Sequence, residues 1–418
     1  MDKTTCCIVG GGPAGMMAGL LLARAGVRVI VLEKHSDFLR DFRGDTVHPS
    51  TVRLLDELGL GEDFARLPQS ALTRMHMYAG DRMVVAADLT RIPGRYRHIA
   101  MVPQWDFLDL LAGAAAAEPT FTLRMNATVV GLTHEAETVT GVRYLDTDGT
   151  EHTLRADLVL ACDGRDSVAG AAAGLRQRME DVPMDMWFFR IPKSPGDTEG
   201  GAVQARFTSG NSAVAIDRGD YYQTGYIIEK GRDAQLRAAH EVDWLRDRVT
   251  ELFGWPAAAT AAIGSWDDVK LLEVTVGMLE RWYVPGLLCI GDAAHTMSPV
   301  GGVGVNLAIQ DAVAAARILA GPLLDRAVTP ADLNKVQRRR MLPANFTQRS
   351  QRGEHEMLIA PALRGTLRTA PLPLRVVDSV PMLAGLAAYL GGIGIRPEHA
   401  PDFARRPGGA VHPSTAAR

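Results

Sequence analysis

The chain has 418 residues, of which 47% are hydrophobic, enough to bury a large core and to form two or more structural units. With 45 basic and 48 acidic residues its formal net charge is -3, which excludes the basic surface typical of nucleic-acid-binding proteins. The four cysteines lie in or beside apolar runs and lack metal-ligand spacing, so we expect reduced thiols, no metal site and a cytoplasmic location.

The N-terminal segment predicts a strand at Thr4–Gly10, a helix at Pro13–Ala25 stopped by Gly26, and a second strand at Val27–Lys34. Apolar periodicity then predicts further helices and strands. The helices are Pro49–Leu58 and Phe107–Ala117, and the extended segments are Met75–Leu89, Ala127–Leu132, Thr138–Leu145, His152–Leu154 and the buried run Ala156–Gly164.

Short strands separated by turn residues run from Asp185 to Glu229 and predict an antiparallel sheet in a second domain. One amphipathic helix is expected from Leu236 to Leu252, and a long polar helix from Thr329-Pro330. The apolar stretch Met382–Ile395 is shorter than the about 20 residues of a membrane span, so we expect a buried or partner-facing helix and no span.

A glycine-rich motif, VGGGPAG, separates the first strand from the first helix. Gly10 permits a tight turn, Gly12 lets a pyrophosphate approach the backbone, and Gly15 lets the helix pack on the strand. Glu33 ends the second strand, where a carboxylate can accept hydrogen bonds from a ribose. The motif in this setting predicts a dinucleotide site, for NAD or FAD.

A late stretch, LLCIGDAAH followed by SPVGGVGVN, indicates which of the two dinucleotides, NAD or FAD, the chain binds. A buried strand delivers Asp292 at its carboxyl end, where a carboxylate can hold polyol hydroxyls. Pro299, Gly301, Gly302 and Gly304 then precede a helix, and their unobstructed amides can cradle the edge of an electron-rich ring. Together these features favour a ring carried on a polyol, as in a flavin.

The stretches GGGPAG, ACDGRDS and IGDAAHTMSPVGGVGVN resemble, in order and spacing, the three fingerprints of the group A flavoprotein monooxygenases, which share the para-hydroxybenzoate hydroxylase fold. The likeness covers roughly Thr4 to Leu342. It implies an α/β fold in which a three-layer, Rossmann-type FAD-binding domain carries an inserted antiparallel β-sheet domain for substrate, followed by a helical C-terminal region.

The resemblance implies these domain limits: residues 1–74, 98–180 and 270–345 for FAD; 75–97 and 181–269 for substrate; 346–404 for the helical region; and 405–418 for a disordered tail. It also implies the residues that contact FAD. They are Gly10, Gly12, Pro13, Ala14, Gly15, Glu33, Lys34, Arg43, Gln104, Val129, Asp163, Gly164, Gly291, Asp292, Pro299, Gly302, Val303, Gly304, Val305 and Asn306.

The reaction implied by the family is hydroxylation or epoxidation of an aromatic or other electron-rich small molecule through a flavin C4a-hydroperoxide, with NAD(P)H and dioxygen as co-substrates. The chain has no second dinucleotide motif between a strand and a helix, as expected if NAD(P)H visits only transiently. Gly170 stands where the family often has an arginine, and this difference leaves the mode of NAD(P)H binding open. The choice between NADH and NADPH is also open, and so is the choice between a monomer and a homodimer.

Few residues are candidates for the chemistry itself, because the cofactor performs it. We predict His48 as a base for a phenolic substrate, and Pro299 and Gly301 beside the reacting oxygen. Strand alternation groups the substrate candidates by face. These are Trp187, Phe189 and Arg190 on one strand and Tyr222, Thr224 and Tyr226 on another, although aromatic residues on strands are more often core.

Three other functions fit the same dinucleotide-binding fold. WFFRIP nearly matches the WxWxIP of flavin-dependent halogenases, but there is no lysine between Lys34 and Lys193 to handle hypohalous acid, which argues against that activity. A flavin reductase or dehydrogenase without oxygen insertion, and a non-catalytic flavin-binding protein, both stay open.

Overall fold

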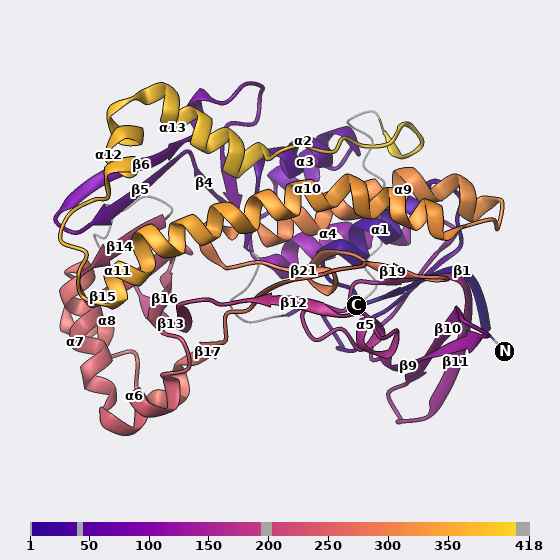
Figure 1. The fold of residues 1–418 in the computed structure, drawn as a ribbon, viewed down its shortest axis with the longest axis horizontal. Coiled ribbons are helices and arrows are strands. Elements are labelled where there is room, and N and C mark those ends of the chain that lie inside the picture. Colours follow the sequence, from indigo (N-terminus) through magenta and orange to yellow (C-terminus); the bar gives the residue numbers. More distant parts are fainter. Residues whose placement is uncertain (1, 40–44, 194–202, 407–418) are drawn as a thin grey trace.

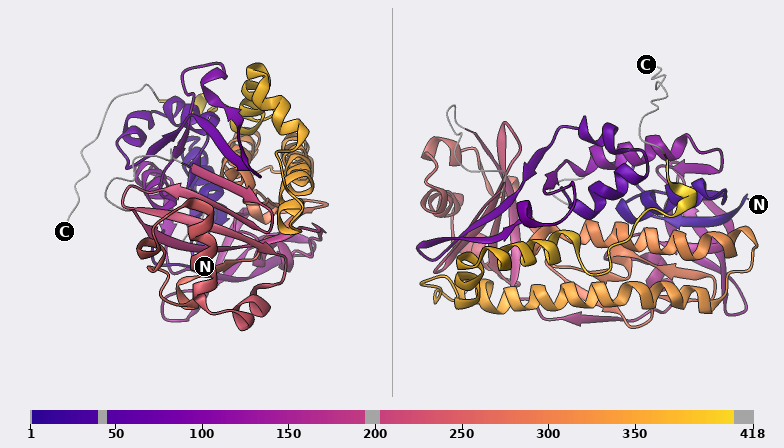
Figure 2. Two further views of the ribbon diagram at one scale, coloured as in Figure 1. Left: turned by 90° about the vertical axis from the view of Figure 1, so that its left-hand side faces the viewer. Right: turned by 90° about the horizontal axis from the view of Figure 1, so that it is seen from above.

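The computed structural model describes residues 2–39, 45–193 and 203–406. Two sheets lie at opposite ends of the molecule, and the long helices α9 (Gly304–Leu324) and α10 (Pro330–Glu354) run between them (Figure 1). Figure 2 shows these two helices side by side along the length of the molecule.

The first sheet has eight strands and a parallel centre. Its core is β1 (Asp2–Val9), flanked by β2 (Val29–Leu32) and β11 (Glu151–Ala161). The carboxyl ends of these strands therefore meet at one edge, with that of β20 (Leu287–Cys289) beyond β11. The remaining strands are β8 (Phe121–Arg124), β9 (Thr128–Glu135), β10 (Thr138–Leu145) and β19 (Tyr283–Val284). The three sequence motifs follow β1, β11 and β20, so the sheet gathers them.

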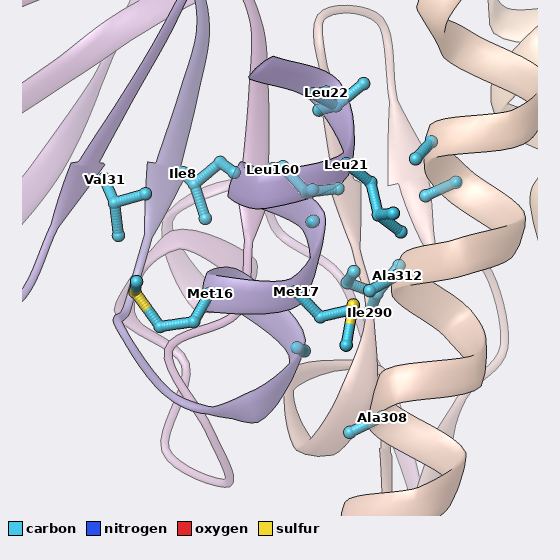
Figure 3. Close-up of a cluster of buried hydrophobic side chains, with 14 of the residues drawn as sticks. Ile8, Met16, Met17, Leu21, Leu22, Val31, Leu160, Ile290, Ala308 and Ala312 are labelled. Carbon is cyan, nitrogen blue, oxygen red and sulfur yellow. The ribbon is translucent and has the colours of Figure 1, made fainter. Parts of the chain in front are cut away.

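Helix α1 (Pro13–Arg24) packs between this sheet and α9, and ten of its residues in succession, Ala14 to Ala23, are buried. Figure 3 shows Met16 directed toward the strands of Ile8 and Val31, while Met17 and Leu21 point toward Ile290 and the helix that carries Ala312. Helix α9 is long and apolar enough to cross a membrane, but 72% of its most apolar window is buried, as in the core helix of a globular domain.

The second sheet has seven strands in the order β17-β13-β16-β15-β14-β5-β6. Their bounds are β5 (Arg74–Ala79), β6 (Arg82–Asp88), β13 (Met184–Pro192), β14 (Val203–Thr208), β15 (Asn211–Asp217), β16 (Tyr221–Glu229) and β17 (Lys270–Leu272). All pairs are antiparallel except β14 with β5. The predicted antiparallel sheet is present, and it also recruits the β5–β6 hairpin.

The amphipathic helix expected from Leu236 to Leu252 is two helices, α6 (Asp233–Ala239) and α7 (Val242–Phe253). The chain breaks at His240, whose extended backbone turns its carbonyl to accept a hydrogen bond from Trp266 Nε1 at 3.0 Å. Only α7 has buried residues, so a tertiary hydrogen bond overrides the local periodicity that joined the two.

The C-terminal region continues without a boundary from α10. That helix passes through residue 345, where the sequence placed the end of the FAD domain, and leads into a π-helical turn at His355–Ile359. The chain continues as α11 (Ala360–Leu363) against β15 and β16, and returns over β6 as α12 (Leu372–Ser379) and α13 (Pro381–Ala388), followed by the π-helical turn η6 (Tyr389–Ile393). Of the tail expected to be disordered, residues 407–418 lie outside the described residues.

Gly15 is the residue on which the packing of α1 over β1 depends most directly, because a Cβ there would lie 1.9 Å from the Gly10 carbonyl oxygen. We expect Gly15→Ala to lower the free energy of unfolding by about 3 kcal/mol in urea denaturation. Gly113→Ala is the matched control: Gly113 lies in α4 (Gln104–Ala116) with open space at its Cβ, so the change should stabilise by about 0.5–1 kcal/mol. Equal effects of the two changes would contradict the proposed packing.

Candidate active site

The first and second motifs touch at Gly10. Its φ of +98° lies in a region that glycine adopts far more readily than other residues. A Cβ at this position would lie 2.5 Å from the carbonyl oxygen of Cys162, which follows β11. Asp163 follows, and its carboxylate accepts hydrogen bonds from Ser167 Oγ at 2.6 Å and from the Ala169 N–H at 3.1 Å, at the start of α5 (Val168–Ala172). The predicted contact residues Asp163 and Gly164 thus form a fixed corner beside the glycine loop.

The glycine loop leaves an open approach to the N-terminus of α1. A Cβ at Gly12 would meet no atom within 4 Å, and Gly12 caps the helix without any side-chain hydrogen bond. Glu33, at the end of β2, accepts the Gly11 N–H at 2.7 Å through Oε2 and holds the loop in place. Free space, a helix N-terminus and a glycine without a side chain suit a pyrophosphate.

The third motif joins the first at Gly291, which has a φ of +60°. A Cβ there would lie 3.2 Å from the Cβ atoms of both Ala14 in α1 and Ala308 in α9. The next residue, Asp292, keeps its side chain 38% exposed, and its nearest cation is Arg165, with Nε 3.7 Å from Oδ2. The three motifs therefore form one site, with the Asp292 carboxylate open beside it.

A buried network of charged side chains holds the turn at Gly291 in place. Asp311, in α9, accepts the Gly291 N–H at 3.1 Å, a hydrogen bond from His295 Nε2 at 2.6 Å and one from Arg340 Nε at 2.8 Å. Burial by itself raises the pKa of Asp311, but His295 and Arg340 outweigh it and the net pKa is lowered. Glu398 closes the network, 3.8 Å from Arg340 Nη1.

The glycine-rich loop after Ser298 is held by side chains from α10 and from the turn that follows it. Gln351 accepts the Ser298 N–H at 3.1 Å and donates to the carbonyls of Ser298 and Val300 at 2.9 and 2.8 Å. Ser298 Oγ lies 2.8 Å from His355 Nε2. Sequence reasoning missed these supports, because they lie more than 50 residues beyond the loop and have no motif of their own.

The loop itself bends at Gly301 and Gly302, with φ of +76° and +61°. Gly302 presses on Thr46: its carbonyl accepts a hydrogen bond from Thr46 Oγ1 at 2.7 Å, and a Cβ would lie 2.5 Å from that atom. Gly304 differs, because a Cβ there would be no closer than 4.0 Å to any atom, with Asp292 Oδ1 among the nearest. Asn306 Oδ1 accepts hydrogen bonds from the hydroxyls of Ser50 and Thr51.

His48, the predicted base, is 1% exposed and lies beneath this loop. Nε2 is 3.2 Å from the Gly302 carbonyl and Nδ1 is 3.1 Å from the Gly391 carbonyl of η6. Burial lowers its pKa to about 4 against the opposing pull of these carbonyls. Its role as a base stays a prediction, and its contacts make it a link between the loop and the C-terminal region.

The other predicted cofactor residues lie around the same edge of the first sheet. Gln104 begins α4, its N–H bonded to Asp45 Oδ1 at 3.1 Å, and Val129 is buried in β9. Lys34 is exposed one residue beyond Glu33. Arg43 lies outside the described residues.

Four of the predicted substrate residues face away from the site. Trp187, Phe189, Tyr222 and Tyr226 share a face, as alternation predicted, but they pack with α7 in a buried core. The loop residue Val300 packs with the opposite face, beside Phe188 and Met186. Their role as substrate contacts stays a prediction, which this placement does not favour because the apolar stripe of α7 covers this face of the sheet. Thr224 shares their face and is fully buried.

The site-facing surface of the sheet carries the alternate residues instead. Arg190 lies opposite Gln223 across β13 and β16, and Gln223 Oε1 accepts a hydrogen bond from Arg218 Nε at 3.3 Å. Arg218 also forms a buried ion pair with Asp45, so the sheet is tied to the segment that positions Gln104. Arg190 remains a substrate candidate on this face, whereas the Arg218–Asp45 pair had no signal in the sequence.

Comparison with known proteins agrees with this geometry. A profile described as "FAD binding domain" matches residues 3–350. The 6-methylpretetramide 4-monooxygenase of Streptomyces rimosus is 33% identical over 363 residues, covering 85% of each chain. The chain belongs to the group A flavoprotein monooxygenases.

Other relatives match this chain over part of their own length, or share only its fold. The 12-dehydrotetracycline 5-monooxygenase/anhydrotetracycline 6-monooxygenase of Streptomyces rimosus is 29% identical, and the match covers 73% of this chain but 60% of that protein. The structure of anhydrotetracycline hydroxylase from the same species superposes with a TM-score of 0.74 at 24% identity, over 94% of this monooxygenase and 77% of that chain. The p-nitrophenol 4-monooxygenase of Pseudomonas putida DLL-E4 has the same fold, with a TM-score of 0.73 at 19% identity, covering 94% and 95%.

Gly304 gives a direct test of where this monooxygenase holds its flavin. Because a side chain at this position contacts little of the protein, we expect Gly304→Val to leave the urea midpoint of the flavin-free protein unchanged. It should reduce FAD affinity at least about tenfold, measured by quenching of flavin fluorescence, because the valine enters the space in front of the α9 N-terminus. Gly353→Val, at an open position near the end of α10, is the control. Unchanged FAD affinity in Gly304→Val would show that the ring lies elsewhere.

The buried network predicts a pH dependence of stability. The folded pKa of Asp311 is lowered, so its contribution is complete above its unfolded pKa of about 4 and is lost as pH falls through the folded value. At pH 7, Asp311→Asn should cost about 3 kcal/mol, because Arg340 loses its buried carboxylate partner and keeps the more distant Glu398 at 3.8 Å and the Arg396 carbonyl at 3.4 Å.

The difference between the two proteins should narrow as pH falls below about 4 in urea denaturation followed by circular dichroism, because unfolded wild-type protein then binds a proton at Asp311 that the folded protein does not bind until its lower pKa is reached. The exposed Asp325→Asn serves as control and should change stability little at any pH. A constant difference between pH 7 and pH 3 would contradict the assigned charge on Asp311.

Proposed function

We propose that this monooxygenase hydroxylates an aromatic polyketide-like or phenolic small molecule, with NAD(P)H and dioxygen as co-substrates. The observation that supports it most is the meeting of the three motifs at one sheet edge, with the second sheet facing the glycine-rich loop through Val300 and Phe188. The name of the relative at 33% identity, 6-methylpretetramide 4-monooxygenase, supports a fused-ring aromatic substrate.

Bound FAD supplies the redox chemistry, passing electrons from NAD(P)H to dioxygen and one oxygen atom to the substrate. The protein's part in the proposal is to bind and to position. The α1 N-terminus and Gly12 would hold the pyrophosphate, Asp292 would hold the hydroxyls of the ribityl chain, and the amides from Gly302 to Gly304 would bind the ring. His48 and Gln351 fix that loop from two sides.

The substrate would lie between the glycine-rich loop and the inner face of the second sheet. Phe188 and Met186 supply apolar contact there, and Arg190 and Gln223 supply polar groups for a phenolic oxygen. The Arg218–Asp45 ion pair keeps the sheet against the loop that carries Gln104. Apolar side chains at such a site would help to exclude water from the reacting oxygen.

For NAD(P)H, a pocket of about 640 Å³ beside α5 is the best candidate. Arg165, Ser167, Gly170 and Ala293 line it. A Cβ at Gly170 would lie 3.0 Å from Ser167 Oγ, so this position has little room for the arginine often found in the family. Arg165 is the cation that can take over contact with a phosphate at this pocket.

The test uses the FAD-loaded protein with NADH or NADPH and a panel of naphthols, anthraquinones and tetracyclic phenols. We expect one class to accelerate NAD(P)H oxidation at least about tenfold and to gain a single oxygen atom from isotope-labelled dioxygen, seen by mass spectrometry. The flavin-poor Gly304→Val protein is the control and should give no product. Accelerated NAD(P)H oxidation without labelled product would favour a reductase, and a chain that binds FAD but is never reduced would favour a non-catalytic protein.

A further inference from the structure

The bent helix pair α12–α13 exposes large apolar side chains in regular stripes. On α12 these are Leu372, 68% exposed, and Val376, one turn apart. On α13 and η6 they are Met382, Leu386 and Leu390, at successive spacings of four, with Met382 75% and Leu386 52% exposed. Val380 at the bend and Met83 on β6, against which both helices pack, extend the same surface.

The distribution of residue sizes on helix α13 is the reverse of that on an ordinary surface helix. Its buried face consists of Ala384, Gly385 and Ala388, and a Cβ at Gly385 would lie 2.9 Å from Cβ of Arg91. Small residues thus face the protein and the largest apolar residues face outward. An apolar patch of this extent on a folded chain marks an interaction surface.

The charged residues of the segment that carries this patch are mostly arginines. From Arg364 to Arg396 the chain has four arginines, Arg364, Arg368, Arg375 and Arg396, and a single acid, Asp378. That acid is already paired, with Arg82 at 3.0 Å and with the Val85 N–H at 3.0 Å. Arg375 lies next to Val376 on α12 and is exposed. No charged residue occurs between Asp378 and Arg396.

This combination favours a partner that is both apolar and anionic. A second copy of the chain bound through a two-fold axis would bring Arg375 toward its own counterpart on the same apolar surface, which costs free energy. An anionic lipid bilayer offers acyl chains to the stripes and phosphates to the arginines. The bend of 107° between the two helices excludes a single straight span, so the pair would lie in the plane of the bilayer surface.

We propose that α12–α13 docks the monooxygenase on the surface of anionic membranes. The helix pair leads directly into η6, whose Gly391 carbonyl contacts His48 beneath the glycine-rich loop. Docking would therefore act on a segment that contacts the glycine-rich loop through His48. The surface itself is independent of the proposed reaction, and its test requires no substrate.

The experiment is co-sedimentation of the full-length, FAD-loaded protein with phosphatidylcholine vesicles, with or without phosphatidylglycerol. We expect binding that requires phosphatidylglycerol and weakens as salt is raised. Met382→Glu with Leu386→Glu should weaken it about a hundredfold, since two exposed anchors become charged. Arg375→Gln should weaken it about fivefold.

Matched changes elsewhere separate the patch from general effects. Leu342→Glu and Arg338→Gln, both at exposed positions on α10, should bind as the wild type does. FAD content and thermal midpoint should stay unchanged in every variant, because the altered side chains are exposed. Wild-type protein that stays in the supernatant with both vesicle types would overturn the proposal. So would a wild-type dimer that the Met382→Glu, Leu386→Glu protein converts to a monomer, since a second copy would then cover the patch.

Discussion

The Asp311 carboxylate is the interaction on which the arrangement of this monooxygenase depends most. A single buried carboxylate receives the Gly291 N–H, His295 and Arg340, and so joins the corner before Asp292 to α9 and to α10. Charges buried this deeply are stable only when each is compensated. The network therefore permits little variation in how the long helices meet the sheet, and the position of Asp292 follows from it.

Close backbone contacts at three glycines also hold the segments of the site together. At Gly10, Gly15 and Gly291 a Cβ would fall 1.9 to 3.2 Å from the atoms of another segment. These contacts allow strands, helix and corner to approach closely enough for one ligand to touch all three motifs. At Gly12 and Gly304 the same residue type has the opposite use, because the space in front of it is open. The first motif thus contains glycines at close contacts, Gly10 and Gly15, and one at an open position, Gly12, which is the division that its spacing predicts.

The sequence predicted those parts of the site that are local in the chain. Gly10, Gly12, Gly15 and Glu33 lie within one β-α-β unit, so their spacing is enough to place them. Gln351 and His355 could not be predicted in the same way, because they reach the loop from α10 and the turn after it, about 50 residues further along the chain and without a motif of their own. Alternation separated the two faces of the second sheet but could not orient them, because that depends on which face α7 covers.

The contacts of His48 explain its position in the structure, whereas its chemical role stays a prediction. Its ring is held between two carbonyls that belong to segments more than 80 residues apart, and a neutral imidazole can donate to only one of them. With a pKa lowered to about 4 by burial, the ring is neutral at physiological pH, so one carbonyl faces a nitrogen lone pair. Such a contact is tolerated only where the surrounding packing fixes it. The packing comes from Ser50 and Thr51, which anchor Asn306, and from Gly392, whose carbonyl accepts a hydrogen bond from Ser50. The loop at the proposed ring site is therefore positioned by the C-terminal region as much as by the dinucleotide fold itself.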